Sequence, residues 1–199
     1  MKKLFYLLVA ALLLTVVACA KPPQQEIDAV TAGLDSAKSA EAATYAPDSL
    51  RAAEDAQAAM QAELDTQQQK FALFRSYKKA TELAKTAQDA AKKAEADAVA
   101  GKEKARQEAE TVIADAKTAI EKAKADVKRA PRGKGSQADI AQLNADITGA
   151  ETTLAEAEST YAGGAYLDAK AKAESAKSAA ETVSADVEKA IEMKKGLRK

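Results

Sequence analysis

The stretch ATELAKTAQDAAKKAEADAVAGKEKA, residues 80–105, decides the fold predicted for this chain. Its small residues recur in steps that alternate four and three, which is the spacing of a heptad seam along one face of an α-helix. The seam consists of Ala80, Ala84, Ala87, Ala91, Ala94, Ala98, Gly101 and Ala105. Because Gly101 falls in register, we expect one helix to continue through it, with the glycine at a close helix contact, although it costs about 1 kcal/mol against alanine. A helix break at Gly101 is the alternative.

The seam is displaced after Ala105. Small or apolar residues continue at Ala109, Val112, Ala116, Ala119 and Ala123. The first of them comes one residue later than the alternation requires. An inserted residue turns the seam around the helix axis, so we expect the helix to change packing partners near this point.

Turn-forming residues divide the rest of the chain. They lie at residues 22–23, 45–49, 131–136 and 163–164. Asp48 or Ser49 can cap the helix after the second turn, and Ser136 or Asp139 the helix after the third. We therefore expect an all-α fold without strands, in which long antiparallel hairpins form an elongated bundle. Its five helices are expected over residues 25–43, 48–70, 74–129, 137–161 and 165–195.

Part of the sequence is repeated. Residues 77–98 match residues 166–187 at a constant offset of 89, and both copies begin with Tyr. Upstream, Leu50, Leu64 and Phe71 match Ile140, Leu154 and Tyr161 at an offset of 90. We interpret this as a duplicated helical hairpin; shared heptad bias is the alternative. The expected domains are repeat unit 1 at 25–98, a connecting helix at 99–129, a basic loop at 130–136 and repeat unit 2 at 137–195.

The N-terminus has the pattern of an export signal. Lys2 and Lys3 precede an uncharged run over residues 4–17. This run is shorter than the roughly 20 residues of a membrane-spanning helix, so a permanent span is the weaker interpretation. The ending Val16-Val17-Ala18-Cys19 resembles the lipobox of bacterial lipoprotein precursors.

The lipobox resemblance implies that residues 1–18 are a signal peptide and that Cys19 is the lipid attachment point, followed by a lipidated linker over residues 19–24. In such precursors an acidic residue after the cysteine usually marks inner-membrane retention, whereas Ala20 stands here. The expected location is therefore the outer membrane, facing the periplasm. The alternative is an ordinary signal peptide with an incidental cysteine.

Two further motifs carry a family resemblance. The helix start Tyr45-Ala46-Pro47-Asp48-Ser49-Leu50 and the aromatic turn Phe74-Arg75-Ser76-Tyr77 precede an alanine-rich helix. Together they resemble a family of Gram-negative envelope lipoproteins built on a helical domain of unknown function. The resemblance covers residues 19 to about 98 and implies location and fold, but it supplies no catalytic residue.

The composition excludes most catalytic chemistry. The 199 residues include 51 Ala and one Cys, but no His and no Trp. Ser-His or Cys-His nucleophilic catalysis and His-type metal sites are therefore absent. We expect no enzyme, no catalytic residue, no cofactor and no metal. The 30 basic and 30 acidic residues balance, which, with export, disfavours a nucleic-acid partner.

The six aromatic residues that follow the signal lie at or beside predicted helix ends: Tyr45, Phe71, Phe74, Tyr77, Tyr161 and Tyr166. We expect them to fill the ends of the bundle, because large rings can fix hairpin register where alanines cannot. The alternative is an aromatic face that binds peptide or glycan. Residues 128–134 contain four cations, which predicts a solvated loop or a contact with anionic lipid.

The chain ends in a basic tail over residues 196–199. Its final Arg198-Lys199 resembles the terminus of murein lipoproteins, in which the last lysine side chain is joined to peptidoglycan. Lys199 is therefore a candidate attachment site; a basic helix end that complements the helix dipole is the alternative.

Narrow alanine seams bury little area per residue, so a remaining seam is expected to face a second copy of the chain or another helical protein. The function expected from the sequence is that of a lipid-anchored periplasmic scaffold or adaptor. The alternative is a peptidoglycan-binding or peptidoglycan-tethered lipoprotein.

Overall fold

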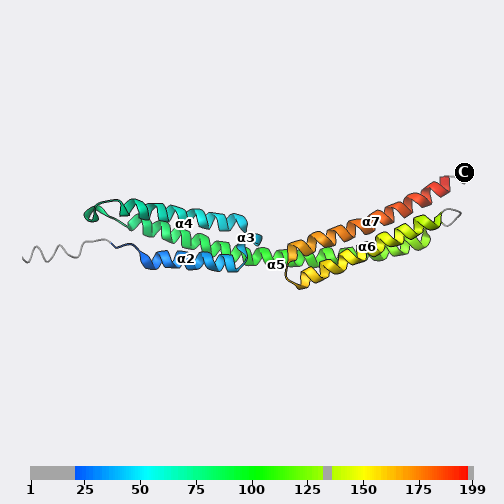
Figure 1. Ribbon diagram of the computed structural model, residues 1–199, viewed down its shortest axis with the longest axis horizontal. Coiled ribbons are helices and arrows are strands. Elements are labelled where there is room, and N and C mark those ends of the chain that lie inside the picture. The colour runs from blue at the N-terminus through cyan, green and yellow to red at the C-terminus, as the bar shows by residue number, and fades with distance from the viewer. Residues whose placement is uncertain (1–20, 132–135, 197–199) are drawn as a thin grey trace, which may run out of the picture. The chain divides into compact units, whose positions relative to one another are not determined.

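The computed structural model describes residues 21–131 and 136–196, and the regular structure in these two ranges is entirely helical. The elements are α2 (Gln24–Ser39), α3 (Ala42–Tyr45), α4 (Pro47–Gln68), the 3₁₀ helix η2 (Ala72–Phe74), α5 (Lys78–Arg129), α6 (Ser136–Ala162) and α7 (Tyr166–Gly196) (Figure 1). The predicted all-α helical bundle is confirmed. No helix in the described ranges is both long enough and apolar enough to cross a membrane.

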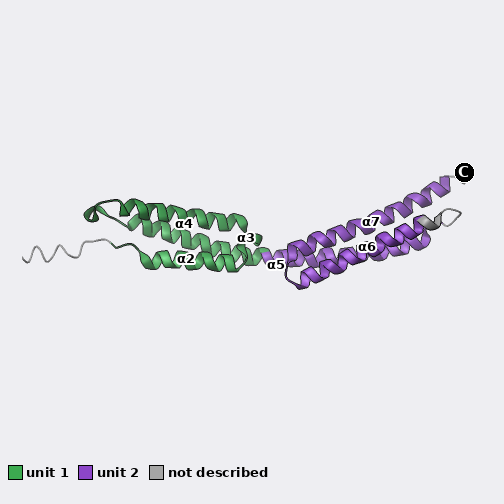
Figure 2. Ribbon diagram, viewed as in Figure 1, with its two compact units in different colours: residues 1–101 green, residues 102–199 purple. Residues whose placement is uncertain are grey.

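The chain forms two compact units that meet between Gly101 and Lys102, within α5 (Figure 2). Unit 1 holds α2, α3, α4 and the first part of α5. Unit 2 holds the rest of α5 with α6 and α7. The sequence predicted a connecting helix over residues 99–129; from Lys102 onward this stretch supplies the third helix of unit 2.

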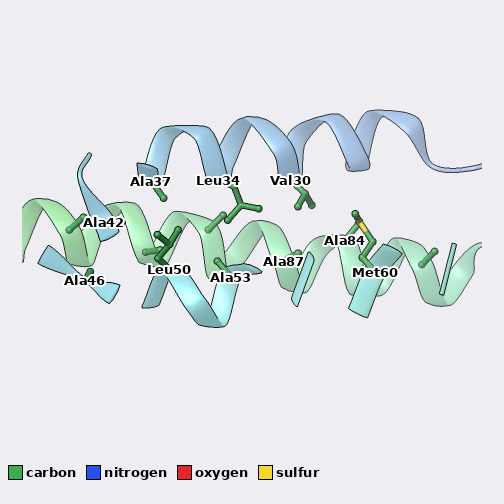
Figure 3. Close-up of a cluster of buried hydrophobic side chains, with 14 of the residues drawn as sticks. Val30, Leu34, Ala37, Ala42, Ala46, Leu50, Ala53, Met60, Ala84 and Ala87 are labelled. Carbon is green, nitrogen blue, oxygen red and sulfur yellow. The ribbon is translucent and has the colours of Figure 1, made fainter. Parts of the chain in front are cut away.

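The core of unit 1 combines alanines, most of them from α5, with larger side chains from α2 and α4 and with Tyr77. Figure 3 shows Val30 and Leu34 pointing from α2 toward α5. The predicted seam is buried in unit 1, with no exposed surface at Ala80, Ala84, Ala87, Ala91, Ala94 and Ala98. Helices approach closely along it: a Cβ added at Gly33 of α2 would lie 3.2 Å from the Cβ of Ala91. Small residues on one helix thus leave room for the branched side chains of its neighbours.

Helix α5 continues through Gly101, as the register predicted. A Cβ added at Gly101 would lie 2.4 Å from the carbonyl oxygen of Tyr45, which is the last residue of α3. Real Cβ atoms do not approach a backbone oxygen so closely. Gly101 is therefore the position at which the backbone of α3 rests on α5.

The core of unit 2 corrects one part of the predicted seam. Ile113 and Ile120 are buried on α5, whereas the predicted Val112 and Ala119 are only partly buried. The extra residue after Ala105 does turn the seam. The next buried residue after Ala109 is then four positions on, at Ile113, and not three positions on, at Val112. The larger isoleucines consequently fill the core.

The two units bury matching positions. Where α5 buries its six alanines in unit 1, α7 buries Ala169, Ala173, Ala176, Ala180, Val183 and Val187 in unit 2. A third helix of each unit also matches, beyond the two helices of the predicted hairpin repeat. It is α2 in unit 1 and the second part of α5 in unit 2. Ile27, Val30, Leu34 and Ala37 on α2 have the same spacing as Ile113, Ala116, Ile120 and Ala123 on α5, and both sets join their unit's core.

Helix boundaries differ from the sequence predictions at several places. The helix predicted to begin at residue 74 begins at Lys78. The helix predicted over residues 25–43 ends at Ser39, because Glu41 has a left-handed φ of 62° that no helix can continue through. The predicted caps Asp48 and Ser49 are wrong. Pro47 occupies the first turn of α4, which needs no amide hydrogen there, and the Ser49 hydroxyl instead donates to Asp97 of α5 at 2.5 Å.

Candidate functional site

The two covalent sites predicted from the sequence, Cys19 and Lys199, lie outside the described residues. The central part of the basic loop, residues 132–135, also lies outside them. The described residue closest in sequence to Cys19 is Lys21, which precedes α2.

The turn between α4 and α5, residues 69–77, holds most of the large hydrophobic side chains that are exposed in the described part of unit 1, and we call it the α4–α5 tip. Phe71, Leu73 and Phe74 are 70%, 68% and 76% exposed. The two phenylalanine rings lie with their centroids 6.4 Å apart. The prediction that aromatic residues fill the bundle ends is wrong for both rings, but Tyr77, with 6% exposure, does pack into the core.

Hydrogen bonds hold the backbone of the tip. The Arg75 guanidinium donates from Nε to the carbonyl of Lys70 at 3.0 Å and from Nη2 to the carbonyl of Gln68 at 2.9 Å. The buried Gln67 side chain accepts from the Ser76 amide at 3.1 Å. These bonds satisfy backbone carbonyl and amide groups that would otherwise bond to water. The backbone of the tip is therefore fixed, and the apolar side chains project from it.

The tip carries positive charge. Lys70 and Arg75 lie within it, Lys78 and Lys79 follow it at the start of α5, and residues 67–79 contain no acidic residue. Lys79 pairs at 2.9 Å with Glu63, which lies outside this segment. The hydrogen bond from Gln67, and after it the one from Lys79, lowers the pKa of Glu63. The ionised carboxylate therefore links the end of α4 to the start of α5, next to the tip.

The start of α2 lies at the same end of unit 1 as the tip. The Gln88 side chain donates to the carbonyl of Glu26 at 3.3 Å, and Gly33 faces Ala91 further along. Helix α2 therefore runs parallel to α5, and both helices begin at one end of the unit, as Figure 1 shows. The described chain thus enters unit 1 at the end of the unit that carries the tip.

The corresponding turn of unit 2 is built differently. Tyr161 and Tyr166 contact each other across the α6–α7 turn, with ring centroids 5.3 Å apart, and both are partly buried. Arg106 donates to the Tyr161 hydroxyl at 3.4 Å and to the Glu103 carboxylate at 2.8 Å. This guanidinium lowers the pKa of Glu103 to about 2. These rings lie against their own unit, unlike Phe71 and Phe74.

Unit 2 has an open groove of about 450 Å³ between α5 and α7. Ion pairs cross it, Lys177 with Asp115 at 2.8 Å and Lys122 with Glu188 at 3.4 Å. Since these charged groups satisfy one another, the groove presents paired charges rather than a converging set of binding groups.

A buried carboxylate lies on the same face of α5. Asp126 is 2% exposed and accepts from Lys122 at 2.9 Å; Arg129 also pairs with it. The hydrogen bond from Lys122, ahead of that from Arg129, lowers the pKa of Asp126 against the opposing effect of burial. No pattern in the sequence distinguishes this buried charge, because Asp126 lies among many surface Asp and Glu of similar spacing.

The low pKa of Asp126 predicts a pH-dependent contribution to stability. A carboxyl whose folded pKa is depressed contributes fully above its unfolded value of about 4, and the contribution disappears as the pH falls through the folded value. Asp126→Asn should lower the free energy of unfolding at pH 7 by on the order of 1 kcal/mol, because both cations are largely exposed and screened. Urea unfolding across acidic pH should show the difference from wild type shrinking. Asp146→Asn, at an exposed position on α6, is the control; an Asp126→Asn effect that is as large at acidic pH as at pH 7 would contradict the assignment.

Comparison with known proteins adds no assignment, since no family model, curated protein or solved structure matches this chain. Within the described part of the chain, no group of three potential metal-ligating residues comes together. Sequence reasoning identified the aromatic turn but missed the outward direction of Phe71 and Phe74, the contribution of Leu73, and the role of Gln67 and Arg75 in fixing the turn.

Proposed function

We propose that this chain is a lipid-anchored scaffold or adaptor protein of a bacterial envelope, held in the outer membrane through Cys19 and facing the periplasm. One observation carries the proposal: the only cysteine of the chain ends a lipobox-like motif that directly follows a basic, then apolar, leader. An acyl chain contributes about 0.8 kcal/mol per buried methylene, so several chains on one cysteine anchor a protein firmly.

The arrangement of charges supports a structural role for the helices. Lysines bridge neighbouring helices in unit 2 to Asp or Glu, as in Lys117 with Glu158 at 2.5 Å and Lys124 with Glu151 at 2.7 Å. In unit 1, Lys38 of α2 pairs with Glu54 of α4 at 3.1 Å. These partly exposed pairs link neighbouring helices within each unit, and each unit offers long helical surfaces to a partner. The expected partner is a second copy or another helical protein.

Replacement of Cys19 by serine tests the anchor. The variant should lose all labelling by a palmitate analogue and move from the membrane fraction to the supernatant in high salt, because a hydroxyl cannot form the thioether that lipidation requires. Ala20→Asp is the matched control. It should keep the label and move to the inner membrane, as in lipoproteins with an acidic residue at this place.

A serine variant that still carries the palmitate label would contradict the proposal. Retention by purified cell-wall sacculi, without lipid, would favour the alternative of a peptidoglycan-tethered protein. The C-terminal Arg198-Lys199 is the sequence feature that supports that alternative.

A further inference from the structure

We propose that the α4–α5 tip is a second membrane contact, which inserts Phe71, Leu73 and Phe74 between the headgroups of the leaflet that holds the chain. The inference rests on the proposed lipid anchor for its orientation. Its occupant is a lipid surface that contains anionic headgroups. Four features of unit 1 support this contact: the clustering of exposed apolar side chains, the fixed backbone of the tip, its charge and the point at which the chain enters the unit.

The apolar side chains are clustered rather than scattered. Six large hydrophobic residues are exposed in the described chain, and three of them fall within four residues at the tip. Single exposed apolar residues are normal on a protein surface, whereas a contiguous group marks an interaction site. An exposed pair of phenylalanines on a turn is therefore a feature that needs a partner.

The tip is already ordered for contact. The Arg75 bonds to the Lys70 and Gln68 carbonyls, and the Gln67 bond to the Ser76 amide, fix the loop without help from the phenylalanines. Docking therefore requires little further ordering of the backbone, which removes a common cost of binding.

The charge of the tip fits an anionic lipid surface. Lys70 and Lys78 flank the apolar residues and are exposed, and residues 67–79 carry no acidic group that would repel lipid phosphates. Aromatic and aliphatic side chains with flanking lysines are the composition of segments that lie in the interfacial region of a bilayer.

The size of the tip favours lipid over protein. Two rings and one leucine can bury on the order of 500 Å² of accessible surface. A stable protein interface buries roughly 800 Å² of accessible surface on each partner. Insertion into a bilayer needs no matching surface. A small convex group of apolar side chains is thus better suited to lipid than to a second copy of the chain.

The entry point of the chain places the tip near the membrane. Gln24 begins α2 at the tip end of unit 1, and Cys19 is five residues earlier in the sequence. Since a residue spans at most about 3.6 Å, the five steps along the chain from Cys19 to Gln24 can separate the two by no more than about 18 Å. Acyl chains on Cys19 therefore hold the tip end of unit 1, and not the α3 end, close to the bilayer.

A single tryptophan can report this contact because the chain has none. Phe74→Trp places the reporter at the tip, and Val99→Trp, at an exposed position on α5 of the same unit, is the matched control. The acylated chains are extracted from membranes and reconstituted into vesicles of phosphatidylethanolamine with a minority of phosphatidylglycerol. Circular dichroism before and after checks that both variants remain helical.

On addition to vesicles, the tip reporter should shift its emission to shorter wavelength and be quenched by brominated lipid. It should also be severalfold less accessible to acrylamide than in the same chain without vesicles. The control reporter should show none of these changes. Lys70→Gln with Lys78→Gln should weaken the shift in the tip-reporter chain. A tip reporter that stays water-exposed while the chain floats with the vesicles would overturn the inference.

The same experiment separates this inference from the anchor. If the chain carries no lipid and does not float, the anchor proposal fails, and vesicles added to the soluble chain then test the tip alone; an unshifted tip reporter in that setting overturns the inference as well. A shift that depends on protein concentration and not on vesicles would identify self-association and would also overturn it.

Discussion

Gly101→Ala should lower the free energy of unfolding by about 2 kcal/mol, although alanine is the better helix former. The added methyl would lie 2.4 Å from the Tyr45 carbonyl oxygen, so the backbone at the end of α3 must move. The gain in helix propensity, about 1 kcal/mol, is smaller than the cost of displacing a packed backbone segment. Urea unfolding followed by circular dichroism measures the difference.

Gly149→Ala is the control for this substitution. Gly149 also lies inside a long helix, α6, but a Cβ added there meets nothing within 4 Å. The same change should therefore raise the stability by about 0.5 to 1 kcal/mol. If both substitutions stabilised the protein equally, the close contact between α3 and α5 would not exist in solution.

Ala173→Leu should destabilise unit 2 by about 1 to 3 kcal/mol, because three extra carbons must enter a closely packed seam. Ala173 has no exposed surface and belongs to the unit 2 core. Ala84→Leu should have a similar effect in unit 1, where Ala84 holds the matching position. Thermal unfolding of each variant measures the loss.

Ala171→Leu is the matched control, two residues away on α7 and exposed. It should be nearly neutral, since leucine and alanine have similar helix propensities. Equal tolerance of leucine at positions 171 and 173 would show that the alanine seam is not a packing surface.

Much of the fold could be predicted because small residues at heptad spacing leave few alternatives. The seam from Ala80 to Ala98 predicts one buried helical face, and Gly101 fits that face only if the helix continues. Turn-forming residues at Pro47 and Gly163 fixed most helix ends to within a few residues. These signals are local, so they can be read along the chain.

The features that the sequence did not predict depend on contacts between distant residues. The exposure of Phe74 goes with the course of a loop whose backbone bonds to Arg75 and Gln67, and no periodic pattern in the sequence indicates that course. The choice of Ile113 over Val112 as the core residue follows from how α5 turns against α6 and α7 in unit 2. Periodicity allows either choice because the two residues are adjacent.

The candidate site was predictable to a different degree in each part. The cysteine of the lipobox-like motif is visible in the sequence alone, because its meaning lies in a short local pattern. The α4–α5 tip becomes a candidate membrane contact only when exposure and the parallel course of α2 and α5 are known. Neither property can be read from residues 69–77 by themselves.

The N-terminal peptide of the protein extracted from membranes tests the central claim most directly. Mass spectrometry should find a chain that begins at Cys19, with a mass increased by a diacylglyceryl group on sulfur and an acyl group on the new amino terminus. A chain that begins elsewhere, or a Cys19 peptide of unmodified mass, would contradict the account of this protein as a lipid-anchored envelope scaffold.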